Sequence, residues 1–385
     1  MTSLSRVTEI LAKLVSFDTT SRGPNLPLIE WVEDFLAPLG AELVRLPDAS
    51  GGKANLWARI GPDAPGGVVL SGHTDVVPVD GQPWTSDPWT VREADGRLYG
   101  RGVSDMKGFI ALCLAHAKAL SEMRLDRPVH FAFSFDEEVG CAGVAPMVRE
   151  IIDRGAAPSL VWVGEPTLWG VVSAHKGIRD YEVKVTGKAA HSSDPRIGAS
   201  AVHEALELMN VLRGIARTAE ATAPAESVFD PSWTTLTIGI VHGGTAPNIL
   251  ARECSFVFDM RPVPGSDPDG MIAPFMEAVA KADARLKAWG EECGVGVIKN
   301  ADAPPLEYVA DSPAERFLRD LTGDNAVRTA SYATEAGQFQ RAGMPAVICG
   351  PGSIEQAHKT DEWIAVSELQ KGLHVFARFL ERLAS

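Results

Sequence analysis

The chain is poor in features that mark several classes of protein. Its five cysteines are scattered, odd in number and form no C-x-x-C pair. Disulfide frameworks and cysteine-ligated zinc sites are therefore not expected, and a reducing compartment fits. No apolar run reaches the roughly 18–20 residues that a membrane-spanning helix needs, so we expect no membrane association.

Positive charge is also scarce. The formal net charge is −14 and lysine and arginine form no block, which argues against a nucleic-acid partner. The first 17 residues (MTSLSRVTEILAKLVSF) mix charges along a helical pattern and lack the basic start and cleavage site of a signal peptide. We therefore expect a cytoplasmic protein that acts on a small molecule.

Helical and strand-like segments alternate along the first part of the chain. Spacing of apolar residues predicts helices over 4–17, 26–39, 106–123 and 141–154. Apolar runs predict strands over 55–60, 68–71, 130–135 and 160–163. This alternation is typical of an α/β fold with a mostly parallel sheet.

The pattern changes in the middle of the chain. It predicts strands over 179–186, 234–241, 253–261 and 295–299, and helices over 199–219 and 268–289. The order βα-ββ-αβ matches a ferredoxin-like α+β domain. After residue 304 the α/β pattern returns, with a strand at 346–349 and a helix at 366–383. We predict a catalytic domain over 1–177 and 303–385, interrupted by an inserted domain over 178–302.

Polar clusters stand beside the predicted α/β elements. SGHTD (71–75), FDEEVG (135–140), VGEPT (163–167) and AHKTDE (357–362) follow strands, and GRGVSDMKG (100–108) precedes a helix. In open α/β sheets, sites form beyond the carboxyl ends of strands. One edge of the sheet would then bring together His73, Asp75, Asp105, Glu137, Glu138, Glu165 and His358.

These side chains suit a pair of divalent metal ions. Asp105, Glu138 and Glu165 carry about three negative charges, and without metal they would raise one another's pKa. Two divalent cations and one bridging hydroxide would balance the site. Nitrogen and oxygen ligands without a thiolate favour zinc, and also cobalt or manganese.

Two further residues of these clusters have distinct candidate roles. Asp75 is placed to hold the ring of His73 through its other nitrogen. Glu137, next to a ligand, is placed to take a proton from a metal-bound water.

Each cluster by itself also has a simpler interpretation. DEE after a strand is commonly a solvated loop, and Asp105 could be a helix N-cap. Glu165 could lie in an exposed turn and His358 in a surface loop. Only the combination of the five clusters favours a metal site.

Ten motifs occur in the order seen in the co-catalytic zinc aminoacyl hydrolases: GHTDVVP, YGRGVSDMKG, DEEVG, GEPT, AHKG, AHSSDP, HGGTAPN, DMRPVPG, YATEA and GPGSIEQAHKTDEW. The sequence resembles this family, which includes acetylornithine deacetylase, succinyl-diaminopimelate desuccinylase, aminoacylase and glutamate carboxypeptidases, over nearly its whole length. The resemblance implies a catalytic domain of zinc-exopeptidase type. It also implies that the inserted domain is a lid and dimerisation domain, and hence a homodimer.

The resemblance further implies a metal-ligand set. Asp105 would bridge two zinc ions, His73 and Glu165 would complete one site, and Glu138 and His358 the other. Cobalt or manganese can replace zinc in such sites. A cis peptide bond after Asp105 is implied as well.

Catalytic roles follow from the same resemblance. Glu137 would be the general acid and base, and Asp75 would orient the first histidine. His191, in GKAAHSSDP, would stabilise the oxyanion, within its own subunit or across a dimer. The alternative for His191 is a loop histidine bonded to Ser192 or Ser193.

The resemblance to acetylornithine deacetylase implies hydrolysis of N2-acetyl-L-ornithine to L-ornithine and acetate, a step of arginine biosynthesis. Arg261 suits the substrate carboxylate because its planar fork binds both oxygens, and Asn248, Gly350 and Gly352 could assist. Glu335 is a candidate partner for the ammonium group. Alternatively, Arg261 forms a surface ion pair and Glu335 is an ordinary exposed carboxylate. Other open functions are a succinyl-diaminopimelate desuccinylase, a broad N-acyl amino acid deacylase and a catalytically silent binding protein.

Overall fold

The computed structural model describes residues 2–384, which form two compact units. The first unit contains the described residues up to Ala174, then Leu306–Thr329 and the residues from Thr334 onward. The second unit contains His175–Pro305 and Ala330–Ala333. The second unit is thus inserted into the sequence of the first.

A six-stranded sheet forms the centre of the first unit, in the order β1-β2-β6-β3-β7-β14. Its strands are β1 (Glu42–Pro47), β2 (Ala54–Ile60), β3 (Val68–His73), β6 (Val129–Ser134), β7 (Leu160–Val163) and β14 (Ala346–Ile348). Strands β6, β3, β7 and β14 run parallel, whereas β2 is antiparallel to β1 and β6. This arrangement confirms the α/β prediction.

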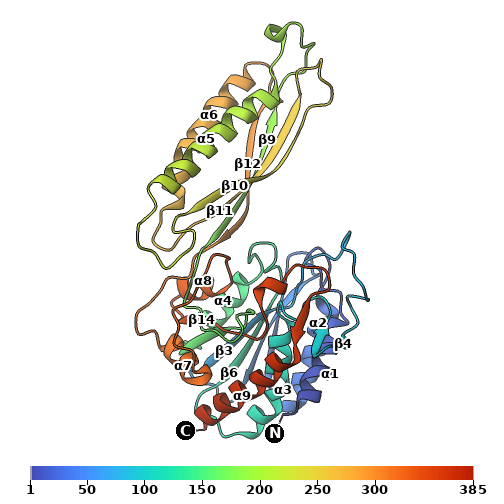
Figure 1. Cartoon of the computed structure of the whole chain (residues 1–385), viewed down its shortest axis with the longest axis vertical. Helices are drawn as coiled ribbons and strands as arrows, with labels where there is room; N and C mark the ends of the chain where they lie inside the picture. The colour runs from blue at the N-terminus through green and yellow to red at the C-terminus, as the bar shows by residue number, and fades with distance from the viewer. Residues whose placement is uncertain (1, 385) are drawn as a thin grey trace. The chain divides into compact units, whose positions relative to one another are not determined.

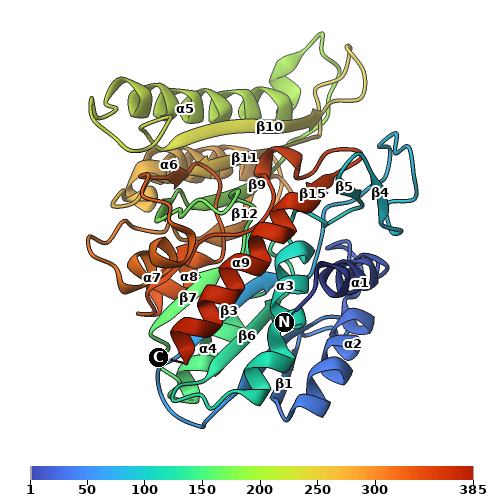
Figure 2. The same cartoon turned by 60° about the horizontal axis from the view of Figure 1, so that its bottom comes forward.

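Helices cover both faces of this sheet, and Figures 1 and 2 show α3 and α9 side by side. The helices are α1 (Leu4–Val15), α2 (Leu26–Leu36), α3 (Lys107–Glu122), α4 (Ala145–Asp153), α7 (Pro313–Thr322), α8 (Ala336–Arg341) and α9 (Val366–Leu383). Alternate residues of β2 point to opposite faces. Leu56 joins the core that contains α1, α3 and α9, while Trp57 lies beneath the guanidinium of Arg154, the C-cap of α4.

Small sheets and 3-10 turns connect these elements. They are β4 (Arg92–Ala94), β5 (Arg97–Tyr99) and β15 (Trp363–Ala365) in one sheet, β8 (Ala174–His175) and β13 (Thr329–Ala330) in another, and the turns η1 (Ala37–Leu39) and η3 (Ile354–Gln356). A further turn, η2 (Pro195–Ile197), lies in the second unit. Trp363 of β15 pairs with Tyr99 of β5. This pairing places the loop after β5 beside the loop that ends in β15. No helix within residues 2–384 has the length and apolar character to cross a bilayer.

The second unit is a four-stranded antiparallel sheet with two helices. Its elements are β9 (Ile178–Thr186), α5 (Ala201–Ala221), β10 (Thr235–Gly243), β11 (Glu253–Arg261), α6 (Pro268–Lys287) and β12 (Gly294–Ala303). The sheet order is β10-β11-β9-β12, which confirms the ferredoxin-like prediction. Figure 1 shows α5 and α6 side by side along one face, where Leu212 and Phe275 pack with Val183 and Phe256.

The predicted elements differ from the structure mainly at their ends. The helix expected from residue 141 begins at Ala145, because the preceding loop turns through left-handed backbone at Asp136 (φ 57°) and Cys141 (φ 55°). The strand expected over 295–299 is longer in the structure. It is β12, which pairs with β9 from Gly294 to Ala303. Edge strand β1 has no fully buried residue and was not predicted.

Candidate metal centre

The carboxyl ends of the parallel strands carry most of the predicted ligands. His73 is the last residue of β3, Glu137 and Glu138 follow β6, Glu165 follows β7, and His358 lies beyond β14. Because these strands are parallel neighbours, their carboxyl ends meet at one edge of the sheet. The apolar strands therefore deliver polar side chains to a single region.

The backbone of Asp75 orients the His73 ring. Its Nδ1 lies 2.9 Å from the backbone oxygen of Asp75, which can only accept, so Nδ1–H donates and Nε2 of the neutral ring carries the lone pair. Nε2 lies 3.1 Å from Asp105 Oδ1 and 3.8 Å from Glu165 Oε1. A lone pair facing two carboxylate oxygens needs a cation or a proton between them. The site therefore fits a metal ion.

Asp105 lies between the two histidines. Its Oδ1 faces His73, while its Oδ2 is 3.5 Å from His358 Nε2. His358 Nε2 is also 2.9 Å from Glu138 Oε2. One carboxylate thus contacts both halves of the site, as a bridging ligand would. The peptide bond between Asp105 and Met106 is cis, as the resemblance implied.

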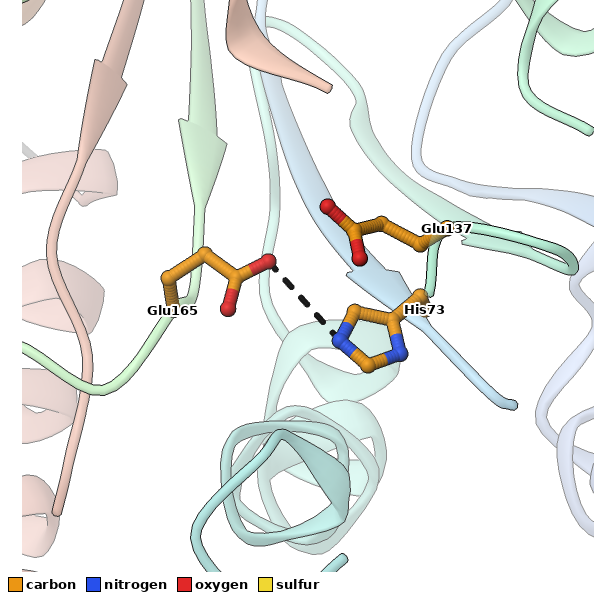
Figure 3. Close-up of side chains that lie close together, drawn as sticks. All are labelled: His73, Glu137 and Glu165. Carbon is orange, nitrogen blue, oxygen red and sulfur yellow. Dashed lines mark ion pairs between the residues drawn. The ribbon is translucent and has the colours of Figure 1, made fainter. Parts of the chain in front are cut away.

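Potential ligand atoms are close enough to share ions. Those of His73, Glu137 and Glu165 lie within 4.8 Å of one another, and so do those of His73, Asp105 and Glu138. Figure 3 shows His73, Glu137 and Glu165 converging from three segments of the chain. The donors are imidazole nitrogen and carboxylate oxygen, a set that suits zinc, cobalt or manganese.

Protons compensate the charges of this site in the metal-free chain. Burial and the charge of Asp105 raise the pKa of Glu138 to about 7 and hold the pKa of Glu165 well above its ordinary value. Hydrogen bonds to Asp105 and Glu138 raise the pKa of His358 to about 10. A bound divalent ion would displace these protons.

Glu137 lies in a tightly bonded loop. Its backbone N–H donates to Asp75 Oδ1 and that of Glu138 donates to Asp75 Oδ2, both at 3.2 Å. The Cys141 thiol donates to Glu137 Oε1 at 3.3 Å. Burial holds the pKa of Glu137 well above its ordinary value. Asp75 thus contacts His73 as predicted, but it does so through its backbone oxygen, because its Oδ1 lies 3.6 Å from His73 Nδ1. Its side chain instead accepts hydrogen bonds from the Glu137 loop.

Three predicted residues belong to the second unit. His191 is exposed, and the backbone N–H of Ser193 donates to its Nδ1 at 3.1 Å, which leaves the proton on Nε2. Asn248 is also exposed. Arg261 Nε donates to Asp259 Oδ2 at 2.9 Å, which is the ion pair of the alternative interpretation. The contact of His191 with Ser193 is likewise that of its alternative interpretation, and its Nε2–H is a donor of the kind that binds an oxyanion.

The remaining predicted residues are buried in the first unit. A Cβ at Gly350 would lie 2.1 Å from the Gly164 oxygen, and Gly352 has φ of 81°, so glycine is required at both positions. Glu335 is 1% exposed, and its Oε1 has no hydrogen-bond partner among the described residues. Burial raises the pKa of Glu335 to about 7. Glu335 is therefore not the ordinary exposed carboxylate of the alternative interpretation.

Sequence reasoning missed two buried residues beside the ligands. Arg101 and Glu362 are each 1% exposed and form an ion pair at 2.9 Å. Glu362 also accepts a hydrogen bond from the backbone N–H of Asp105. Both residues stand inside the motifs noted above, GRGVSDMKG and AHKTDE, which was the available signal. Their pairing across 261 positions of sequence left no local pattern.

Comparison with known proteins identifies the family. Residues 69–382 match the family described as Peptidase family M20/M25/M40, and the chain belongs to this family. It is 37% identical over 373 residues to an acetylornithine deacetylase of Myxococcus xanthus, covering 96% of this chain and 95% of that protein. It is 34% identical to an acetylornithine deacetylase of Aliivibrio fischeri strain MJ11, covering 92% and 89%. The chain is therefore a hydrolase of this family, similar to acetylornithine deacetylases.

Solved structures share the fold. A family M20 metallo-carboxypeptidase from Sulfolobus solfataricus superposes with a TM-score of 0.79 at 18% identity, covering 98% of this chain and 99% of that one. A Bacillus subtilis protein described as a dinuclear metal binding peptidase from the M20 family gives 0.63 at 14% identity, covering 99% and 98%. Human carnosine dipeptidase 1 gives 0.74 at 19% identity, covering 99% and 97%.

Proposed function

We propose that the chain removes the acetyl group from N2-acetyl-L-ornithine, giving L-ornithine and acetate. The observation that carries this proposal is the carboxylate of Asp105 placed between His73 and His358, with one oxygen toward each. The choice of N2-acetyl-L-ornithine as the substrate is supported by the 37% identity with an acetylornithine deacetylase over 96% of the chain.

The proposed cofactor is a pair of zinc ions, which cobalt or manganese can replace. Asp105 would contact both ions, with His73 and Glu165 on one side and Glu138 and His358 on the other. The bound ions would lower the pKa of a water and polarise the acyl oxygen. The raised pKa values of Glu138 and Glu165 support this assignment, because both carboxylates are costly to ionise without a cation.

Glu137 would move the proton of the reaction. It accepts a proton from the attacking water while the water oxygen bonds to the acyl carbon. When the C–N bond breaks, Glu137 returns that proton to the leaving amine. The hydroxyl group of the water ends in acetate and its proton in ornithine. The hydrogen bond from Cys141 and the burial of Glu137 support this role.

The substrate contacts are part of the same proposal. His191 would donate Nε2–H to the oxyanion, a contact of a kind worth about 3 kcal/mol. Arg261 would bind the α-carboxylate, assisted by Asn248, and Glu335 would pair with the ammonium group. Gly350 and Gly352, which are buried, are proposed to shape the pocket with their backbone.

We also propose a homodimer formed through the second unit. Strand β10 is an edge of its sheet, and Ile240 and Val241 on it are 49% and 50% exposed. Exposed apolar edge strands favour pairing with another chain. A cytoplasmic location stays a prediction.

The test is hydrolysis by the purified, metal-reconstituted protein. N2-acetyl-L-ornithine is compared with N-succinyl-diaminopimelate and N-acetyl-methionine, and amine release is measured. A preference for acetylornithine supports the proposal. A preference for the succinyl substrate would indicate a desuccinylase instead. Similar rates on all three substrates would indicate a broad N-acyl amino acid deacylase. No hydrolysis by protein with bound metal would favour a silent binding protein.

A further inference from the structure

Glu362 holds the loop that carries Asp105. Its side chain is buried, and its Oε1 accepts hydrogen bonds from the backbone N–H groups of Ser104 at 2.8 Å and Asp105 at 3.1 Å. Its Oε2 accepts from the backbone of Gly102 and from Arg101 Nη1, both at 2.9 Å. One carboxylate thus fixes the backbone on which the central ligand is mounted.

Arg101 and Gln82 extend the same network to His358. Arg101 Nη2 donates to Gln82 Oε1 at 2.6 Å, and Arg101 Nη1 to the backbone oxygen of Lys359 at 3.3 Å. Gln82 Nε2 in turn donates to the backbone oxygen of His358 at 3.1 Å. Trp84 donates to Gln82 Oε1 at 2.9 Å, and its ring lies 5.1 Å from the Arg101 guanidinium. The network therefore contacts the backbone on both sides of the Asp105–His358 pair.

The contacts fall on one half of the centre. Glu362 itself lies four residues after His358, so the loop that supplies this histidine also supplies the carboxylate that holds Asp105. His73 is instead fixed by the Asp75 backbone oxygen. Loss of the network should therefore displace Asp105 and His358 while His73 keeps its support.

We propose that Glu362, acting with Arg101 and Gln82, positions Asp105 and His358 and thereby sets the affinity for the metal ions, more strongly for the one assigned to Glu138 and His358. Asp105 would contact both ions, but only that ion would lose the placement of two of its ligands. This inference rests on the proposed metal centre and is independent of the substrate. Substitution of a residue that orients a metal ligand in this way typically weakens metal binding by 10- to 100-fold.

Two substitutions separate positioning from folding. Glu362→Gln keeps the shape of the side chain, but its amide nitrogen would face backbone N–H donors and Arg101 would lose its charge partner. Gln82→Ala removes the bonds to Arg101 and His358 and leaves the buried ion pair intact. Gln82 is only partly buried, so this variant is expected to fold even where Glu362→Gln does not.

The matched control is Glu315→Gln. Glu315 is a buried carboxylate of α7 that pairs with Arg319 at 2.8 Å. Its substitution also removes one buried charge from the first unit. It should leave both metal affinities unchanged.

The experiment is titration of the metal-free full-length protein with Co²⁺, followed by calorimetry and visible absorption. We expect the wild type to bind two equivalents, and each network variant to bind one equivalent about 10- to 100-fold more weakly and the other with a smaller loss of affinity. If Gln82→Ala and folded Glu362→Gln bind both metal equivalents with wild-type affinity, this proposal alone is overturned. Equal weakening of the two equivalents in these variants would overturn it as well. Binding of fewer than two equivalents by the wild type would overturn it together with the proposed metal centre.

Discussion

At the scale of single residues, the sequence was most informative where several chemical groups had to converge. The structure brings His73, Asp105 and Glu165 together, and Asp105 with Glu138 and His358. Their motifs are short and rich in titratable groups, so they stand out from the chain around them. Hydrogen bonds that depend on tertiary contacts, such as that from Cys141 to Glu137, could not be predicted from spacing.

The metal-free protein should lose stability as pH rises from about 5 to 7. Glu138 has an ordinary pKa of 4.5 and a folded pKa of about 7, so between these values the folded chain keeps a proton that the unfolded chain has released. Each pH unit in that window lowers the free energy of unfolding by about 1.4 kcal/mol per group. Glu335, with a pKa raised to about 7, adds to the same trend.

Chemical denaturation in the presence of a chelator measures this dependence. Glu335→Gln should reduce the slope, and metal-loaded protein should show a flatter profile. A metal-free protein whose stability is constant or rises over this range would contradict the assignment of raised pKa values.

Cys141 should contribute to turnover through its hydrogen bond to Glu137. Cys141→Ala removes a weak bond of about 1 kcal/mol, so kcat should fall about fivefold with little change in KM. Cys141→Ser keeps a donor and should recover most of the rate. Cys113→Ala, which empties a comparable buried position in α3, is the control. Equal rates in the alanine and serine variants would show that the thiol acts only by packing.

At the scale of elements, buried strands were predicted well and edge elements poorly. β3, β6 and β7 are fully buried, and their apolar runs are visible in the sequence. The edge strand β1 and the short strands β4 and β5 are only partly buried, so tertiary pairing rather than apolar pattern defines them. The junction after β7 depends on close packing that the sequence shows only as Gly164.

Gly164 illustrates such a junction. A Cβ there would lie 2.0 Å from the buried ring of Phe109, so Gly164→Ala must displace that ring or the end of β7, which carries Glu165. We expect a loss of roughly 1–3 kcal/mol in the free energy of unfolding and weakened metal binding. Denaturation and metal titration measure the two effects.

The matched control is Gly214→Ala in α5. The space around Gly214 is open, so alanine should raise stability by up to about 1 kcal/mol through its helix propensity. Similar behaviour of the two alanine variants would contradict the packing argument.

At the scale of the whole molecule, the change of pattern along the sequence indicated the two kinds of fold. The βαββαβ order of the second unit follows from its periodicity, and its strand pairing agrees with that expectation. Association between chains leaves no comparable pattern in one sequence. The homodimer therefore rests on the family resemblance and on the exposed edge of β10.

Ile240→Glu should convert a dimer into a monomer. The substitution places a charge on the exposed edge strand, where pairing with a second chain would bury it. Sedimentation equilibrium measures the mass in solution. Val327→Glu, at a residue of the first unit that is 70% exposed, is the control and should leave the mass unchanged. A monomeric wild type, or a dimer that persists in Ile240→Glu, would contradict the proposed interface.

We propose that this chain hydrolyses an amide at a metal centre, with Glu137 as acid and base. The most direct measurement compares acetate release from N2-acetyl-L-ornithine by the zinc-loaded wild type and Glu137→Gln, with metal content determined on the same samples. Both proteins should bind zinc equally, and the variant should be slower by about 10²- to 10⁴-fold. Comparable rates at equal zinc content would contradict this proposal.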